Sequence, residues 1–340
     1  ARPLRSMRRR TLLKAAAGLA LTGLAADQYR AASGPHHTGM TPDPEASEDI
    51  ANLSFRDPSH IKMLQFTDLH FYQWPWRRDL DQRTRDDMRR LVDRHAPDLL
   101  LITGDLWNNN PMHVGSHYMA DCLALIESLG RPWLFTWGNH DRLDDYVAGH
   151  RALAAAPQSL YRGGKNSGCY QVHLQDKQKK TLWKLICINT SGAGLAAPQQ
   201  KWLSTIGPDG PPSFAIFHIP LQQQSGLWDE GKGQGVKLEK VGFGVENGAT
   251  VKQLQSLGVR ACITGHDHVN DYSVPWENVE LIYGRATGYA GYGHDRVPKG
   301  GKLYELNAEN GKYAWSSVLA DGSHWTPHGR ISQWRPDIFQ

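Results

Sequence analysis

Long apolar runs are absent from this 340-residue chain, and no stretch of 18 consecutive apolar residues occurs in it. The sequence therefore predicts no ordinary transmembrane helix. Cysteine is scarce as well, and Cys122, Cys169, Cys187 and Cys262 match no zinc-ribbon or redox spacing. Cys187 and Cys262 lie in apolar runs, where buried thiols are the simplest interpretation. A Cys169–Cys187 disulfide across a hairpin stays open.

Acidic residues are missing from residues 1–26, which contain six of the 38 basic residues. Without this segment, 32 basic residues face 34 acidic ones, and the formal net charge falls from +4 to −2. A nucleic-acid-binding protein needs a basic face. The composition of the remaining chain lacks that excess, so we expect no nucleic-acid partner.

The N-terminal segment has the parts of a secretory signal. Residues 7–14 read MRRRTLLK and precede the short apolar stretch AAAGLALTGLAA. The Arg9-Arg10 pair resembles a bacterial twin-arginine signal. We expect residues 1–26 to be a signal peptide cleaved near Ala25 or Ala26, with an anchoring or amphipathic helix as the alternative. The protein would then use the twin-arginine export machinery and be periplasmic or secreted, with no stable membrane insertion after cleavage.

The rest of the chain predicts one layered α/β domain. Residues 27–58 are rich in small and polar residues and read as a flexible linker, residues 59–320 as the domain, and residues 321–340 as a C-terminal tail. Periodic patterns predict surface helices near 79–95 and 113–129. Strands are expected at 61–66, 98–103, 132–136, 168–174, 182–189, 213–217, 259–263, 279–283, 301–306 and 312–318. This order predicts a four-layer α/β/β/α sandwich of two mixed β-sheets flanked by helices. The Gln- and Gly-rich residues 222–248 read as a long loop.

Polar clusters follow five of the predicted strands. They are Thr67-Asp68-Leu69-His70, Gly104-Asp105, Gly138-Asn139-His140-Asp141, His218 and Gly265-His266-Asp267-His268. Sites of open α/β sheets form beyond the carboxyl ends of strands, so we expect these clusters to converge.

The residue types of these clusters suit two metal ions. Asp68 and His70 are two residues apart, so both side chains are expected to point the same way from an extended segment, and His266 and His268 repeat the spacing. Imidazole, carboxylate and amide ligands without thiolate favour Mn, Fe or Zn. Each cluster alone is a weak signal, since Asp-x-His pairs also occur on surfaces and Gly-Asn-His-Asp is also a common turn.

The five clusters in this order resemble the calcineurin-like metallophosphoesterase superfamily over residues 61 to about 306. Gly265–Asp271 and Tyr283–Tyr292 further resemble its purple-acid-phosphatase-like branch. The resemblance implies one metal held by Asp68, His70, Asp105 and His268. It implies a second metal held by Asp105, Asn139, His218 and His266, with Asp105 bridging. Both ions are expected to be divalent or mixed-valent.

Two positions depart from the pattern of true purple acid phosphatases. Asn108 stands where those enzymes have the tyrosine that binds ferric iron, and His70 stands where they have glycine. The protein is therefore not expected to be purple.

The resemblance also implies a mechanism in which a hydroxide shared by two metals attacks phosphorus. Metal binding lowers the pKa of water towards ~7. His140 would be the general acid, and Asp141 and Asp267 are candidates for orienting the ligand imidazoles. Arg285 is the candidate phosphate clamp, because guanidinium binds phosphate in a fork. Tyr289 and Tyr292 lie in a glycine-rich segment expected to line the mouth of the site.

Three functions remain open at this stage. The first is a phosphomonoesterase, and the second is a phosphodiesterase acting on small or nucleotide diesters. The third is a binding module on a degenerate phosphoesterase fold. The third predicts lost ligands, whereas all seven ligand positions and His140 are present in the chain.

Overall fold

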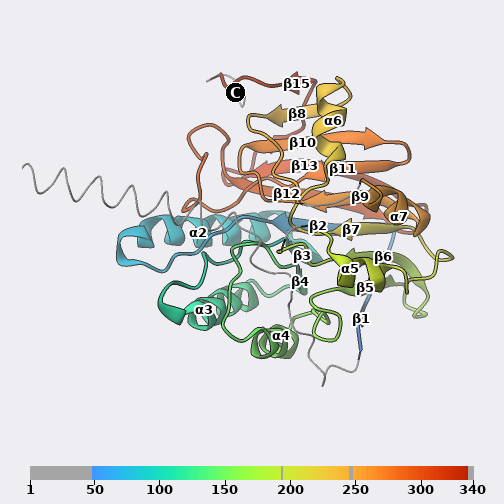
Figure 1. The fold of residues 1–340 in the computed structure, drawn as a ribbon, viewed down its shortest axis with the longest axis horizontal. Coiled ribbons are helices and arrows are strands. Elements are labelled where there is room, and N and C mark those ends of the chain that lie inside the picture. Colours follow the sequence, from blue (N-terminus) through green and yellow to red (C-terminus); the bar gives the residue numbers. More distant parts are fainter. Residues whose placement is uncertain (1–47, 193, 245–247, 336–340) are drawn as a thin grey trace, which may run out of the picture. The chain divides into compact units, whose positions relative to one another are not determined.

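The computed structural model describes residues 48–192, 194–244 and 248–335. The expected signal peptide, residues 1–26, lies outside these residues, as does most of the expected linker. In the described part of the chain, two mixed sheets are flanked by helices, which confirms the predicted sandwich (Figure 1). No helix there combines the length and the apolar character that crossing a bilayer requires.

The larger sheet is mixed, with a run of four parallel strands at its centre. Strands β6, β7, β9 and β11 are parallel to one another, whereas β5 and β10 run antiparallel to their neighbours β6 and β11. In the described residues its order is β1 (Ile50–Ser54), β5 (Tyr170–Gln175), β6 (Thr181–Cys187), β7 (Ser213–Ile216), β9 (Val259–Thr264), β11 (Val279–Tyr283), β10 (Asn270–Trp276), β8 (Gln234–Lys237) and β15 (Arg330–Ile331).

The smaller sheet joins a parallel half to an antiparallel half. Strands β2, β3 and β4 are parallel, and β12 attaches to β2 in the antiparallel direction. In the described residues its order is β14 (His324–Trp325), β13 (Lys312–Leu319), β12 (Gly300–Asn307), β2 (Ile61–Phe66), β3 (Leu99–Ile102) and β4 (Trp133–Phe135). The carboxyl ends of β2, β3 and β4 therefore lie at one edge.

Helices cover both sheets on their outer faces. Beside the smaller sheet lie α2 (Arg78–His95), α3 (Gly115–Ser128) and α4 (Tyr146–Ala155), with the 3-10 turns η1 (Pro75–Arg77) and η2 (Pro111–His113). Beside the larger sheet lie α5 (Ala197–Leu203), α6 (Gln223–Asp229) and α7 (Thr250–Ser256). The sequence pattern predicted α2 as a surface helix. In the structure, Met88, Leu91 and Val92 share one face of this helix and are buried.

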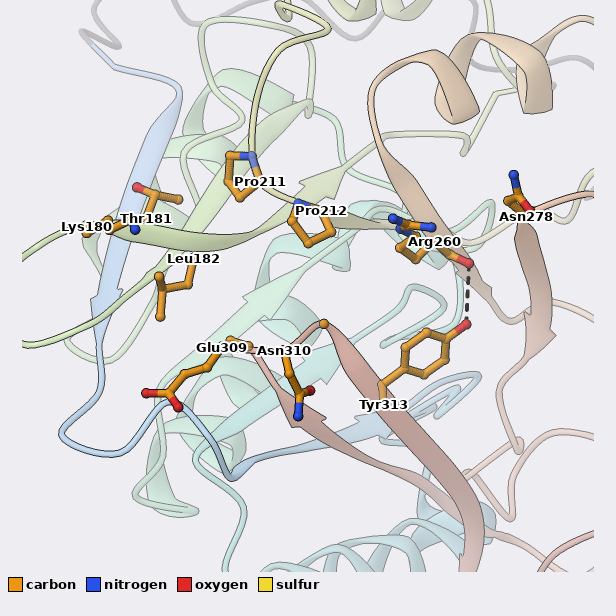
Figure 2. A pocket seen from close by; sticks show the side chains of 12 residues that line it. Lys180, Thr181, Leu182, Pro211, Pro212, Arg260, Asn278, Glu309, Asn310 and Tyr313 are labelled. Atoms are coloured by element: carbon orange, nitrogen blue, oxygen red, sulfur yellow. Dashed lines mark hydrogen bonds between the residues drawn. The ribbon is translucent and has the colours of Figure 1, made fainter.

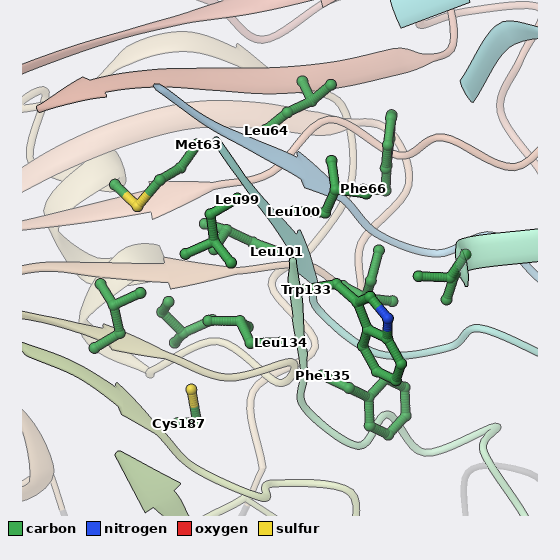
Figure 3. Close-up of a cluster of buried hydrophobic side chains, with 14 of the residues drawn as sticks. Met63, Leu64, Phe66, Leu99, Leu100, Leu101, Trp133, Leu134, Phe135 and Cys187 are labelled. Carbon is green, nitrogen blue, oxygen red and sulfur yellow. The ribbon is translucent and has the colours of Figure 1, made fainter. Parts of the chain in front are cut away.

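Alternate side chains of the strands point to opposite faces of each sheet, and those on the inner faces form the core between the two sheets. Phe214 and Ile216 of β7 join the cluster between the sheets, whereas the intervening Ala215 packs with the helices. All four residues of β3 are fully buried, as their unbroken apolar run predicts. Figure 3 shows Leu99, Leu100 and Leu101 of β3 beside Trp133 and Phe135 of β4.

Cys169 and Cys187 do not form the disulfide that the sequence left open. Cys187 belongs to the cluster between the sheets, and Cys169 belongs to the cluster on the helix side. The two thiols therefore lie on opposite faces of the larger sheet.

The expected domain boundaries need correction at both ends. Strand β1 lies inside the expected linker and pairs in parallel with β5, so the larger sheet begins at Ile50 rather than after residue 58. Strands β14 and β15 lie inside the expected tail and pair with β13 and β8. Strands β1 and β15 take their partners from distant segments, which local patterns do not reveal, whereas β14 is a two-residue strand that forms a hairpin with β13.

The expected long loop 222–248 is likewise partly structured. Helix α6 and strand β8 occupy residues 223–229 and 234–237. Trp228 of α6 is buried against Tyr272 of β10, with ring centroids 4.6 Å apart. This contact packs α6 against the larger sheet.

Candidate metal centre

The predicted ligands lie on loops that leave the carboxyl ends of β2, β3, β4, β7 and β9. The two sheets meet there, because the Asp68 carboxylate of the smaller sheet accepts the N–H of His266 at 3.1 and 3.2 Å. A parallel bridge between Thr67 and Ala286 adds a second link. The structure thus brings together the clusters that the sequence analysis expected to converge.

Asp68, His70 and His268 form a first group of buried side chains, with one ligand atom of each within 4.8 Å of the others. Nε2 of His268 lies 3.5 Å from Oδ1 of Asp68 and 3.0 Å from Nε2 of His70. Nε2 of His70 in turn lies 3.5 Å from Oδ2 of Asp105. Donors at these separations suit one metal ion among them.

Asp105, His218 and His266 form a second group with the same spacing. Nε2 of His218 lies 3.2 Å from Oδ2 of Asp105 and 3.3 Å from Nδ1 of His266. The amide oxygen of Asn139 also lies 3.2 Å from Nε2 of His218. Asp105 contacts histidines of both groups, so its carboxylate is placed to be shared between them.

Hydrogen bonds on the second ring nitrogen orient three of the four ligand imidazoles. A neutral imidazole carries one N–H, so a bond at Nδ1 to an acceptor leaves Nε2 available as a ligand. The Nδ1 pairs are His218 with the Thr103 carbonyl at 2.8 Å, His70 with Oδ1 of Asn108 at 3.3 Å and His268 with the Tyr292 carbonyl at 3.4 Å. His266 instead turns its Nδ1 toward His218.

The backbone at the ligands differs from the expected extended segments. Asp68, His70, Asp105 and His266 have φ values of 55°, 49°, 52° and 84°. Non-glycine residues rarely adopt this left-handed region, and such residues cluster at functional sites. The expectation of an extended Asp68-x-His70 segment is therefore wrong, and the inward direction of both side chains comes from tight loop turns.

Close backbone approach explains the glycine before Asn139. A Cβ at Gly138 would collide with the backbone nitrogen and carboxylate of Asp105. With glycine there, the loop comes close enough for Oδ1 of Asp105 to accept the His140 N–H at 2.8 Å. The other carboxylate oxygen, Oδ2, faces His70 and His218.

The electrostatics of the site favour bound cations. Burial alone would raise the pKa of Asp105, but His218 and the other histidines hold that pKa well below its ordinary value. Burial opposes protonation of His218, yet the Asp105 carboxylate outweighs it and raises the pKa of His218 to about 10. Burial lowers the pKa of His70 to about 3. Two buried carboxylates, Asp68 and Asp105, therefore draw positive charge to this cluster.

His140 lies at the edge of the cluster, with its ring centroid 4.9 Å from that of His70. Burial lowers the pKa of His140 to about 4, although the Asp105 carboxylate opposes the shift. At neutral pH His140 is therefore a neutral imidazole here, able to donate one N–H to an oxygen.

Asp141 and Asp267 bind backbone N–H groups and, for Asp267, a tyrosine hydroxyl, rather than the imidazoles that they were expected to orient. The Asp141 carboxylate accepts the N–H groups of Asp105, Leu106, Trp107 and Gly138 at 2.7 to 3.3 Å. It therefore fixes the loop after β3 against the loop after β4. The Asp267 carboxylate accepts the hydroxyl of Tyr283 and the N–H of Gly242.

Arg285 is not placed as the expected phosphate clamp. Its guanidinium is fully buried and lies 2.5 Å from the Asp271 carboxylate. It also donates to the carbonyl of Pro298 at 2.9 Å. The local sequence could not show this, because Arg285 follows β11 whereas Asp271 lies on the neighbouring strand β10.

The two tyrosines of the glycine-rich segment have different surroundings. The Tyr289 hydroxyl donates to Asp87 of α2 at 2.8 Å, and Arg83 lies over its ring, so Tyr289 is directed away from the expected substrate position. The Tyr292 ring instead stacks on His268, with centroids 4.0 Å apart and planes 10° apart. Its hydroxyl donates to Glu239, which lies in the segment expected to be a loop and which sequence reasoning missed.

A separate groove of about 640 Å³ lies where β6, β7 and β9 begin (Figure 2). Lys180, Pro212, Arg260 and Tyr313 line it, and the Tyr313 hydroxyl donates to the Arg260 carbonyl at 3.4 Å. It contains none of the predicted ligands. The metal-binding chemistry therefore belongs to the opposite ends of these strands.

The fold and the paired groups of N and O donors are those of a phosphoesterase with candidate ligands for metal ions. The family profile described as calcineurin-like phosphoesterase matches residues 61–270, more than half of the chain. The chain belongs to this family and is a hydrolase of phosphoric esters.

Named relatives agree with this class, and a solved structure shares the fold. "Probable inactive purple acid phosphatase 28" of Arabidopsis thaliana is 23% identical over 78% of this chain and 80% of its own length. Phosphatase DCR2 of Saccharomyces cerevisiae is 24% identical over 78% of this chain, which spans only 55% of that protein. A dimetal phosphatase from Danio rerio shares the fold, with a TM-score of 0.51 and 10% identity over 76% of this chain and 99% of the other.

Proposed function

We propose that the protein is a phosphomonoesterase that uses two metal ions, Mn, Fe or Zn. The observation that carries the proposal is the position of Asp105, whose carboxylate lies between the two ligand groups. A carboxylate in this place can bridge two ions about 3.5–4 Å apart. The donor set of imidazole, carboxylate and amide, without thiolate, fits such ions.

When bound, the ions would supply a nucleophile at neutral pH by lowering the pKa of water, and would neutralise charge on the phosphate. The chain's residues then have distinct tasks. Asp68, His70 and His268 would hold one ion, Asn139, His218 and His266 would hold the other, and Asp105 would be shared by both. As a neutral imidazole, His140 would donate a hydrogen bond from its ring N–H to the leaving oxygen or to a phosphate oxygen rather than a proton, and Asp105 accepts its backbone N–H.

Two observations favour a monoester over a nucleic-acid diester. The chain without residues 1–26 has a net charge of −2, which disfavours a polyanionic substrate. Two of the relatives are named phosphatases. The word "inactive" in the Arabidopsis name describes that protein, whereas in this chain all seven ligand positions and His140 converge.

A substrate pair tests the proposal. We expect metal-free protein supplied with Mn, Fe or Zn to hydrolyse p-nitrophenyl phosphate with a higher kcat/KM than bis(p-nitrophenyl) phosphate. Faster turnover of the bis-ester would establish the phosphodiesterase alternative. No turnover of either ester with two bound ions per chain would favour the binding module.

We also propose export by the twin-arginine pathway, supported by Arg9-Arg10 and the apolar stretch after them. This pathway carries folded proteins, so metal can be loaded before export. Replacing both Arg9 and Arg10 with lysine keeps the charge but should retain the protein in the cytoplasm, as cell fractionation would measure. Unchanged export of the double variant would contradict this proposal.

A further inference from the structure

His268 is held more completely than the other ligand histidines by one residue, Tyr292. The Tyr292 ring stacks on the imidazole at 4.0 Å and 10°, and its carbonyl lies 3.4 Å from Nδ1. Within the described residues, the other ring contacts of ligand histidines are tilted or edge-on. Tyr292 thus restrains both the plane of the His268 ring and the nitrogen that faces the metal position.

The Tyr292 ring is itself fixed by Glu239. The hydroxyl lies 2.9 Å from both oxygens of the Glu239 carboxylate. The same carboxylate accepts the N–H of Val269, the residue after His268, at 3.0 Å. Glu239 therefore ties the segment after β8 to both Tyr292 and the ligand loop.

The backbone of Tyr292 is restrained from the other side. The buried Lys299 donates to the Tyr292 carbonyl at 2.8 Å, the same oxygen that faces His268. The preceding Gly291 lies against the imidazole, since a Cβ there would be 2.6 Å from Cε1 of His268. The loop can approach this closely only because residue 291 has no side chain.

We propose that Tyr292, supported by Glu239, is a positioning residue for His268 and selectively strengthens binding of the ion held by Asp68, His70 and His268. This inference rests on the proposed function. Groups that orient a ligating histidine typically change metal affinity by about 10- to 100-fold. The ion held by Asn139, His218 and His266 lacks this contact, so the two ions should respond differently.

Metal binding to Tyr292→Leu tests the inference directly. Metal-free protein is dialysed against Mn²⁺ or Co²⁺, bound ions are counted, and the visible spectrum of the Co²⁺ form is recorded. We expect one ion to bind about 10- to 100-fold more weakly and the other to change less than about two-fold. Tyr289→Phe is the matched control: it removes a hydroxyl hydrogen bond from the same loop, to Asp87, and should leave both affinities unchanged.

Two milder variants keep the test decisive if Tyr292→Leu does not fold. Tyr292→Phe keeps the stacked ring and loses the bond to Glu239, and Glu239→Gln weakens the same bond from the other side. Both should weaken the same single ion, by less than Tyr292→Leu does. Parental affinity in these folded variants, or equal weakening of both ions, would overturn the inference. Failure of the parent chain to bind two ions would overturn the proposed function, and the inference with it.

Discussion

Replacing Asp105 with alanine is expected to abolish binding of both metal ions and, with it, nearly all hydrolysis of phosphate esters, because the ions would supply the nucleophile. The reason is that one carboxylate lies beside His70 of the first group and His218 of the second, at 3.5 and 3.2 Å. Its loss removes a shared ligand and leaves the histidines without a central negative charge. Metal analysis of the purified variant and hydrolysis of p-nitrophenyl phosphate measure the two effects.

Asp121→Ala is the matched control for this prediction. Asp121 also lies beside a histidine, His117, at 3.7 Å, but both side chains are exposed on α3. Its removal should change neither metal content nor activity, since exposed ion pairs contribute little. Two tightly bound ions per chain in Asp105→Ala would show that Asp105 does not bridge.

Replacing Asp271 with asparagine is expected to lower the free energy of unfolding by about 3–5 kcal/mol. The Asp271 carboxylate lies 2.5 Å from Arg285 and 2.7 Å from Lys302, and all three side chains are fully buried. The neutral amide leaves two buried cations without their counter-charge. Urea unfolding measures the change. In the control Asp229→Asn, whose exposed carboxylate lies 3.8 Å from the ammonium group of Lys237, the loss should stay below about 1 kcal/mol.

The pH dependence of the difference in unfolding free energy between the parent protein and Asp271→Asn is a further check on this prediction. Burial alone would raise the pKa of Asp271, but Arg285 and Lys302 outweigh it and hold that pKa below its ordinary value. A carboxyl group with a lowered folded-state pKa stabilises the protein above its unfolded pKa of about 3.9. The difference between parent and Asp271→Asn should therefore stay constant from pH 7 to about 5 and shrink only as the pH falls below about 4. A difference that already shrinks between pH 7 and 5 would contradict the assignment of an ionised Asp271.

The elements predicted correctly are those with strong local patterns. Strand β3 is a run of four leucine and isoleucine residues, and α2 has one apolar face. In both elements, the pattern of neighbouring residues is enough to predict which side chains are buried. Strands β1, β8, β10, β14 and β15 were missed. Strand β10 contains Asp271 and Pro275, which disfavour a strand locally, and its pairing with β11 and β8 compensates for them.

The sequence by itself determined the α/β class and the candidate ligands, because each ligand immediately follows a strand that its apolar residues reveal. Parallel strands then bring those ligands to one edge. Only the tertiary structure decided the roles within residues 284–293. Arg285 turns into the core toward Asp271, Tyr289 turns to α2, and Tyr292 lies on His268. The partner of Arg285 lies on β10, that of Tyr289 on α2, and that of Tyr292 after β9. Because these partners are distant in sequence, the local pattern of the glycine-rich segment does not show which of its residues contacts the metal centre and which stabilise the fold.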